Sequence, residues 1–214
     1  IITTFAVVAG VEGAKLIIGV ILVLGVANLL ADGISMGIGD YLSTKSEREY
    51  QKREREREMW EVENYPEGEK LEMVELYEDK GMKKEDAEAM VDIMSKYKDT
   101  WVDIMMVEEL GILEDNDSPL NNAIATFLSF LAFGSIPLVS YILALMIPGL
   151  SSNKILLFVL AIILTCITLF VLGALKTQFT GKKVLIAGLE MLLVGGGAAA
   201  AAYFIGFLLN FLVA

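Results

Sequence analysis

Four long, mostly apolar stretches limit what this chain can fold into. They lie at residues 16–42, 120–150, 155–175 and 184–214. A helix needs about 20 mostly apolar residues to cross the hydrocarbon core of a bilayer, so each stretch is long enough to span a membrane. A fifth stretch, residues 1–14, is too short to do so. We interpret it as the end of a first membrane helix whose beginning precedes this sequence.

A charged segment separates the first two long stretches. Residues 41–118 hold 24 of the 28 acidic residues and 12 of the 17 basic residues, so this segment accounts for the formal net charge of −11. We therefore divide the chain into spans 1 and 2 at residues 1–42, a charged domain at 43–118 that continues the second span, and spans 3–5 at 119–214. Basic residues follow residue 42 and recur at 176–183, and such loops face the cytoplasm. The charged domain is expected to be cytosolic.

Helical patterns fill this domain, and no strand pattern is evident. The second span is expected to run on as one helix through residue 62, because residues 43–62 contain no helix breaker. Pro66 and Gly68 should end it, and further helices are expected at residues 69–80, 85–95 and 100–113. The predicted fold is all-α, a multi-pass helical membrane bundle with a cytosolic helical metal-binding domain.

The chemistry open to this chain is limited by two residue types. Histidine is absent and Cys166 is the single cysteine. The chain therefore lacks the usual neutral ligand of zinc and iron, and it can form neither an internal disulfide nor a zinc site of several thiolates. Metal binding must use carboxylates, methionines and backbone oxygens.

Two pairs of glutamates flank the Pro-Gly break. Glu58 and Glu61 precede it, and Glu69 and Glu72 follow it. Residues three apart on a helix share a face, so a chain reversal at residues 64–68 can bring the two pairs face to face. Facing carboxylates repel strongly unless a cation lies between them. The spacing predicts a metal site.

Methionines lie near a further glutamate of the predicted 100–113 helix. Met105 and Met106 precede Glu109 by one turn. Carboxylates alone suit Ca²⁺, Mg²⁺ or Mn²⁺, whereas nearby thioethers favour softer ions such as Fe²⁺. Two alternatives stay open: the glutamates can be solvated charges on exposed helix faces, and the methionines can be core packing residues.

The second span carries a ridge of residues at steps of four, namely Asn28, Asp32, Met36 and Asp40. An acid inside the bilayer costs about 2.5 to 3.5 kcal/mol, so it normally faces a cavity, a partner or an ion path. Asn28, Asp32 and Met36 are therefore predicted to line a transport pathway, whereas Asp40 can reach the interface. Glu190, alone in the last span, is a further pathway candidate.

Other features favour structural interpretations. Glu12 lies at a loop and is interpreted as solvated. The glycines and alanines of residues 195–202 form a smooth helix face, suited to packing within the bundle or against a second copy. Pro137 and Pro148 are expected to kink or end the third span.

Short motifs are spread over nearly the whole chain. They are GISMG at 33–37, YLSTKSE at 41–47, the two glutamate pairs, WVDIMM at 101–106 with Glu109, IPL at 136–138 and FTG at 179–181. Together they resemble the vacuolar iron transporter family, membrane carriers that move Fe²⁺ out of the cytosol.

This resemblance implies a dimer with five spans per chain, exchange of metal for protons, and Met36 as a pore ligand. It implies a cytosolic domain whose metal ligands are Glu58, Glu61, Glu69, Glu72, Glu109, Met105 and Met106. An aspartate of the family's first span would fall before Ile1. The pore glutamate of plant-type members falls on Asn28, which cannot carry a proton, and Asp32, one turn away, can substitute.

The leading hypothesis is an integral membrane transporter, not an enzyme, that exports Fe²⁺ from the cytosol. It would act in a vacuole-type or prokaryotic cell membrane, by metal/proton antiport. Mn²⁺, Zn²⁺ or a broad range of divalent ions are the alternative substrates. The expected partners are metal ions, protons, the lipid bilayer and a second copy of the chain, with no cofactor and no nucleic acid.

Two other classes of function are considered. The paired glutamates are similar to those of di-iron carboxylate oxidases, but such enzymes use Glu-x-x-His motifs, and this chain has no histidine. A membrane-anchored metal sensor would need its spans only as anchors, and the acids within the spans argue for transport instead.

Overall fold

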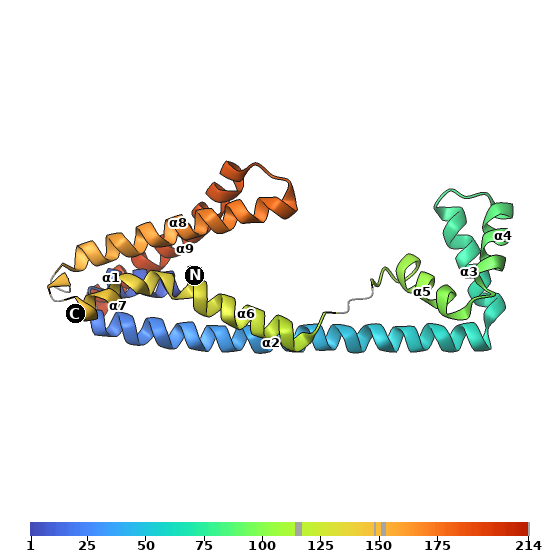
Figure 1. Ribbon diagram of the computed structural model, residues 1–214, viewed down its shortest axis with the longest axis horizontal. Helices are drawn as coiled ribbons and strands as arrows, with labels where there is room; N and C mark the ends of the chain where they lie inside the picture. Colours follow the sequence, from blue (N-terminus) through green and yellow to red (C-terminus); the bar gives the residue numbers. More distant parts are fainter. Residues whose placement is uncertain (114–116, 148, 151–152, 214) are drawn as a thin grey trace. The chain divides into compact units, whose positions relative to one another are not determined.

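The computed structural model describes residues 1–113, 117–147, 149–150 and 153–213. Every regular element in these ranges is helical, which confirms the predicted all-α class. The elements, shown in Figure 1, are α1 (Ile2–Gly13), α2 (Ile18–Asn64), α3 (Pro66–Asp79), α4 (Lys84–Met94), α5 (Lys98–Glu108), α6 (Pro119–Gly134), the short 3₁₀ helix η1 (Ile136–Leu138), α7 (Val139–Met146), α8 (Lys154–Thr180) and α9 (Val184–Val213).

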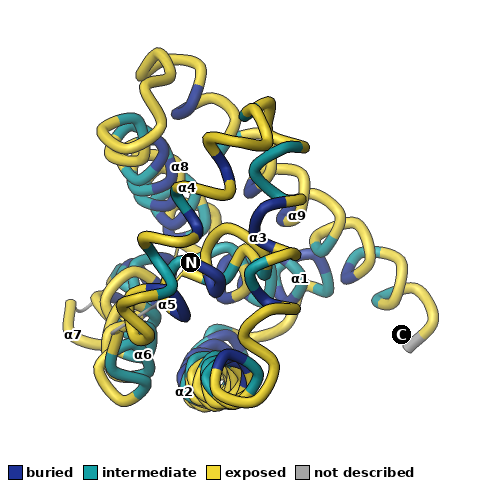
Figure 2. The backbone as a smooth tube through the Cα atoms, turned by 90° about the vertical axis from the view of Figure 1, so that its right-hand side faces the viewer, coloured by how far each residue is buried: buried dark blue, intermediate teal, exposed yellow. Residues whose placement is uncertain are grey.

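Four helical segments are long and apolar enough to cross a membrane. They are α2, the α6–α7 segment Pro119–Met146, α8, and α9 as far as Leu212, while α1 is apolar but shorter. At most 33% of the apolar part of each segment is buried within the chain. Figure 2 shows exposed residues along α8 and α9, between intermediate and buried ones. Apolar surface on this scale is typical of helices that contact lipid or a partner chain.

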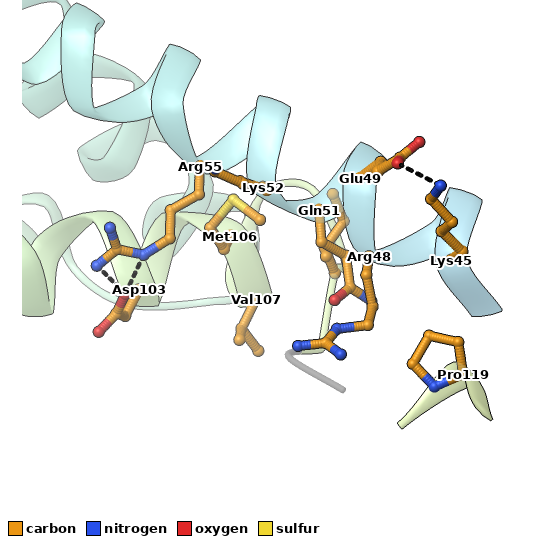
Figure 3. Close-up of a pocket in the computed structure, with 11 residues that line it drawn as sticks. Lys45, Arg48, Glu49, Gln51, Lys52, Arg55, Asp103, Met106, Val107 and Pro119 are labelled. Atoms are coloured by element: carbon orange, nitrogen blue, oxygen red, sulfur yellow. Dashed lines mark hydrogen bonds and ion pairs between the residues drawn. The ribbon is translucent and has the colours of Figure 1, made fainter. Parts of the chain in front are cut away.

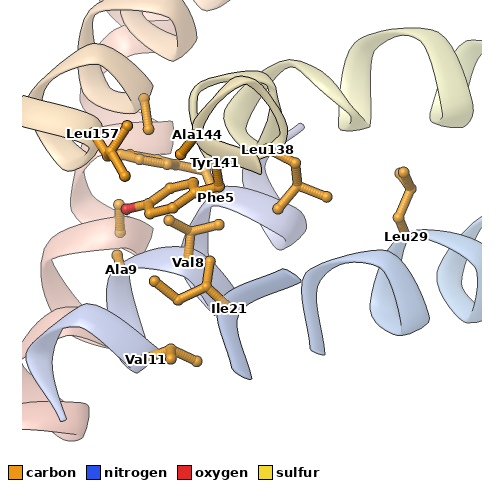
Figure 4. Packing of buried hydrophobic residues seen from close by; sticks show 12 residues of the cluster. Phe5, Val8, Ala9, Val11, Ile21, Leu29, Leu138, Tyr141, Ala144 and Leu157 are labelled. Atoms are coloured by element: carbon orange, nitrogen blue, oxygen red, sulfur yellow. The ribbon is translucent and has the colours of Figure 1, made fainter. Parts of the chain in front are cut away.

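The chain packs as two compact units. The first comprises Ile1–Asp40 and Ala123–Ala214, and the second comprises Tyr41–Asn122. In the first unit α1 packs along α9, and α8 packs along α9 and α7. Its core surrounds Tyr141, which is fully buried together with Val8 and Leu157 (Figure 4).

Glycines allow the backbones of the first unit to approach closely. A Cβ atom on Gly206 of α9 would lie 1.9 Å from the carbonyl oxygen of Gly10 in α1, and one on Gly13 would lie 2.2 Å from the carbonyl oxygen of Tyr203. Gly196 and Gly197 have no such neighbour within 4 Å. The close contact between α1 and α9 therefore lies further along α9 than the Gly-Gly-Gly run.

The predicted third span is divided in three. α6 ends at Gly134, η1 carries Pro137, and α7 completes the segment, which confirms the interruption expected at this proline. Proline lacks the N–H that would continue the helical hydrogen bonds. The other expected break, Pro148, lies outside the described residues.

In the second unit α2 continues without a break to Asn64, as its lack of glycine and proline in this part predicts. The expectation for Pro66 and Gly68 was wrong in detail. Pro66 begins α3 instead of ending α2, and Gly68 lies inside α3. Proline is favoured at the first position of a helix, because the N–H that it lacks would have no helical partner there.

The end of α5 also differs from the prediction. The helix stops at Glu108, not at residue 113, and Glu109 is its C-cap. Gly111 follows with a positive φ of 66°, a conformation that glycine adopts without strain and that commonly follows a helix end. The core between α3, α4 and α5 is built around Trp101, Met73 and Met105.

Candidate metal centre

The candidate centre lies in the second unit, where α2 gives way to α3. Tyr65 alone connects the two helices, with φ −133° and ψ 46°, and its N–H donates to the carbonyl oxygen of Glu61 at 2.6 Å. Because the reversal is this short, glutamates near the end of α2 face glutamates in the first turns of α3.

Five glutamates form two overlapping groups. One carboxylate oxygen from each of Glu58, Glu61 and Glu69 lies within 4.8 Å of the other two, and the same holds for Glu69, Glu72 and Glu109. Metal–oxygen bonds of about 2.0 to 2.6 Å place ligands on opposite sides of one ion about 4 to 5 Å apart. Each group therefore has the spacing that a divalent cation requires, and Glu69 belongs to both.

Burial makes these charges costly. Glu58 is 1% exposed and Glu69 is 7% exposed, and Oε2 of Glu58 has no hydrogen-bond partner among the described residues. Burial first, and then the charges of Glu72, Glu61, Glu58 and Glu109, raise the pKa of Glu69 to about 7. A neighbouring divalent cation would favour the ionised form of such a carboxyl group.

Two other glutamates of the cluster also have raised pKa values. Burial raises the pKa of Glu58 most, with smaller contributions from Glu61 and Glu54, while its hydrogen bond from Arg57 opposes the rise. Burial of the carboxyl group and the charges of Glu58 and Glu72 raise the pKa of Glu109, although that residue is exposed as a whole. The cluster therefore holds its protons more tightly than isolated glutamates would.

Arg57 and Glu54 also contact the cluster, although neither belongs to the predicted ligand set. Arg57 Nη2 lies 2.9 Å from Oε1 of Glu58, Nη1 lies 2.8 Å from Oε2 of Glu54, and Nε lies 3.8 Å from Oε2 of Glu61. Glu54 is only 5% exposed. The available signal was spacing, because Glu54 precedes Glu58 by four residues and so shares its helix face.

The two methionines occupy the core of the second unit. Met105 is fully buried and Met106 is 8% exposed, both in the apolar cluster that contains Trp101 and Met73. Core packing is therefore the role that their surroundings show. Their predicted part in holding a metal stays a prediction.

The ridge of α2 contains two hydrogen-bonded acids. Asn28 Nδ2 donates to Oδ2 of Asp32 at 3.0 Å, and the hydroxyl of Thr126 in α6 donates to Oδ2 of Asp40 at 2.6 Å. Met36 is 51% exposed in the single chain. The structure thus pairs Asn28 with Asp32 and leaves Met36 on an open face, and their predicted role in transport stays a prediction.

Two further acids have partners. Glu190 Oε2 lies 3.3 Å from Nζ of Lys182, and both side chains are about half exposed. Its place on a transport pathway stays a prediction. The interpretation of Glu12 as merely solvated was wrong, because the buried hydroxyl of Tyr141 donates to Oε1 of Glu12 at 2.9 Å. The sequence could not indicate this hydrogen bond, because 129 residues separate Glu12 from Tyr141 and only the tertiary fold brings them together.

Comparisons with known proteins agree on one family. The sequence model of the VIT family matches residues 1–207. A protein named vacuolar iron transporter from Toxoplasma gondii is 43% identical, over 100% of this chain and 72% of its own length. One of the same name from Plasmodium falciparum is 38% identical over 98% of this chain and 78% of its own. Vacuolar iron transporter 1 of Arabidopsis thaliana is 34% identical over 93% and 77% respectively.

Proposed function

This chain belongs to the VIT family, and from that premise we propose that it is an iron transporter that carries Fe²⁺ across a membrane. Its relatives are named as iron transporters, so it is a transporter and not an enzyme. Four apolar helical segments of sufficient length provide the membrane setting that this activity needs.

The observation that carries the proposal is the position of Glu69 in both groups of carboxylates. A residue shared in this way lets an ion move between two neighbouring sites while it keeps one ligand. Hard carboxylate oxygens bind Fe²⁺, Mn²⁺ and other divalent ions. We assign this cluster the role of collecting metal from the aqueous side before the ion enters the membrane.

The placement of charges supports a direction for transport and a coupling to protons. Basic residues after span 2 and in the loop after α8 favour a cytosolic location for the cluster, so iron would leave the cytosol, either into a vacuole-like compartment or across a cell membrane. Asn28, Asp32 and Met36 line the proposed path. Protons moving the other way through the acids of that path would drive the metal, and a second copy of the chain would complete the pore.

Fe²⁺ is the proposed substrate, with Mn²⁺, Zn²⁺ or a broad range of divalent ions as the second candidate. The carboxylates of the cluster do not distinguish Fe²⁺ from Mn²⁺, because they bind both ions well. Only the methionines would favour the softer Fe²⁺.

The test is metal uptake into proteoliposomes that contain the full chain. Fe²⁺, Mn²⁺, Zn²⁺ and Ca²⁺ are compared, each with and without an imposed pH gradient. We expect Fe²⁺ uptake that increases when the receiving side is acidic. Uptake no faster than in protein-free liposomes would contradict transport, and uptake indifferent to the gradient would contradict antiport. Oxygen consumption, measured in parallel, would reveal an oxidase.

A further inference from the structure

A groove outside the glutamate cluster lies between α2 and α5, and Ile112 and Pro119 also line it. Its volume is about 540 Å³, large enough for the head group of a phospholipid. Four basic side chains of α2 line it, namely Lys45, Arg48, Lys52 and Arg55. Their spacing of three, four and three residues places their Cα atoms along one side of the helix. Figure 3 shows the Lys45 side chain turned toward Glu49 and the Arg48 side chain pointing away from it.

The opposite side of the groove is largely apolar. Val107 and Ile112 line it, together with Met106. Arg55 connects the two sides, since its Nε and Nη2 donate to Oδ1 of Asp103 at 3.1 and 2.9 Å. The groove therefore presents cationic groups on one side and hydrocarbon on the other.

Carboxylates neutralise these cations only in part. In the described part of the chain, Glu49 and Asp103 are the acids that line the groove, against four basic residues. Lys45 Nζ lies 3.8 Å from Oε1 of Glu49, and Lys52 Nζ lies 3.7 Å from Oε1 of Glu56. Both are exposed pairs, which contribute little. Among the described residues, no carboxylate lies within ion-pair distance of Arg48. The described lining of the groove thus keeps a positive excess within an otherwise acidic unit.

Both sides of the groove are close in sequence to membrane spans. Lys45 follows Leu42, the last apolar residue of the second span, by three residues, which is about 4.5 Å along a helix. Pro119, which also lines the groove, begins the third span. A basic cluster immediately beside a membrane helix attracts anionic lipids. Because Lys45 and Pro119 adjoin these spans in the sequence, we expect the groove to face the lipid head groups.

We propose that this groove binds the phosphate-bearing head group of an anionic phospholipid. Arg48 and Lys52 hold the phosphate, while Val107 and Ile112 contact the hydrocarbon next to the glycerol. Guanidinium and ammonium groups donate charge-assisted hydrogen bonds to phosphate oxygens. The proposal does not depend on which metal the protein carries.

The experiment uses the full chain in nanodiscs of phosphatidylcholine that contain a minor share of phosphatidylserine. The protein is then extracted from the nanodiscs and purified in detergent. The phosphatidylserine that stays bound to it is measured by mass spectrometry. Arg48→Gln with Lys52→Gln is expected to reduce retained phosphatidylserine about tenfold or more, because each basic group near the surface contributes attraction. Lys83→Gln with Lys84→Gln, in and just before α4, removes the same charge away from the groove and should retain normal binding.

Three results would overturn the proposal. The first is equal loss of lipid in both double variants, which would show an effect of net charge alone. The second is unchanged retention in the Arg48/Lys52 variant. The third is equal displacement of the lipid by millimolar inorganic phosphate, which would show a site for free phosphate. Arg48→Lys with Lys52→Arg keeps both charges and is expected to retain the lipid. Loss of lipid in this variant as well would indicate misfolding and not the loss of charge.

Discussion

Glu69 combines burial with contacts to two groups of carboxylates. Its side chain lies in the first turn of α3, where negative charge is favoured by the helix N-terminus, yet its pKa is raised to about 7 because burial and its acidic neighbours outweigh that effect. The guanidinium of Arg57 offsets part of this repulsion on the α2 side, through Glu54 and Glu58. A divalent cation would offset it more fully.

At the residue scale, Glu69→Gln should weaken divalent metal binding more than Glu72→Gln or Glu61→Gln. Glutamine keeps the size of the side chain but removes the charge that both groups share. We expect a loss of at least about tenfold in affinity, or about 1.4 kcal/mol, measured by calorimetry on the full chain in detergent. Glu75→Gln, an exposed change on the same helix, is the control, and an equal loss there would contradict the role of Glu69.

The raised pKa of Glu69 also predicts how metal binding depends on pH. With a pKa of about 7, the carboxyl group is protonated at pH 6 and ionised at pH 8 when no metal is bound. At the lower pH the metal must displace this proton, so affinity should fall by up to about tenfold per pH unit below pH 7. Titrations with Mn²⁺ at several pH values test this. Glu69→Gln should show a flatter dependence, and an unchanged slope in that variant would assign the proton to another residue.

At the scale of elements, α1 and α9 depend on close backbone contact. A Cβ atom on Gly206 would overlap the carbonyl oxygen of Gly10, whereas one on Gly196 has nothing within 4 Å. Gly206→Ala should therefore destabilise the membrane unit by about 1 to 3 kcal/mol, a typical cost of overpacking. Gly196→Ala, on the same helix, should be neutral or mildly stabilising. The thermal stability of the two variants is compared by gel filtration in detergent after heating. Equal stability of the two variants would contradict a close contact between Gly206 and Gly10.

The same elements show what the sequence could predict. Long apolar runs identify membrane helices, and the absence of glycine and proline between residues 40 and 64 predicts the continuous α2. The glutamate pairs could be predicted from the sequence, because helical spacing and a turn depend on residues that are close together in the chain. The position of Pro66 in the turn could not be predicted, because proline can either end or begin a helix. Pro66 begins α3 because Tyr65 alone makes the reversal between α2 and α3.

Contacts between distant segments could not be predicted. Tyr141 donates to Glu12 across 129 residues, and Gly206 meets Gly10 because of how α1 and α9 pack. A glycine-rich run draws attention to residues 195–197 by composition, but close approach depends on which helix face meets a neighbour. Burial of Glu54 likewise depends on tertiary packing, because its local sequence is that of a solvated helix.

At the scale of the whole molecule, the glutamate cluster and the α2 ridge should affect transport differently. The cluster concentrates the ion, an effect that abundant substrate can replace, whereas a lost pathway ligand leaves a desolvation barrier that concentration cannot remove. Glu58→Ala with Glu61→Ala should raise the half-saturating Fe²⁺ concentration about tenfold, and Met36→Ala should mainly lower the maximal flux. Initial rates in proteoliposomes over a range of Fe²⁺ concentrations separate the two effects. A lower maximal flux in the glutamate variant, together with a raised half-saturating concentration in Met36→Ala, would contradict these separate roles.

Coupling to protons should depend on Asp32. Asn28 cannot carry a proton, but its amide donates to Oδ2 of Asp32 at 3.0 Å, which orients that carboxyl group and leaves its other oxygen for a proton or a metal ion. Asp32→Asn keeps the shape and removes the titrating group, so it should abolish the increase in Fe²⁺ flux caused by an acidic receiving side. Asp40→Asn, two turns further along the ridge, is the matched control, because the Thr126 hydroxyl already occupies an oxygen of Asp40, and it should keep that increase. Proteoliposomes in which Asp32→Asn responds normally to the gradient would exclude Asp32 as the coupling residue and would direct attention to Glu190.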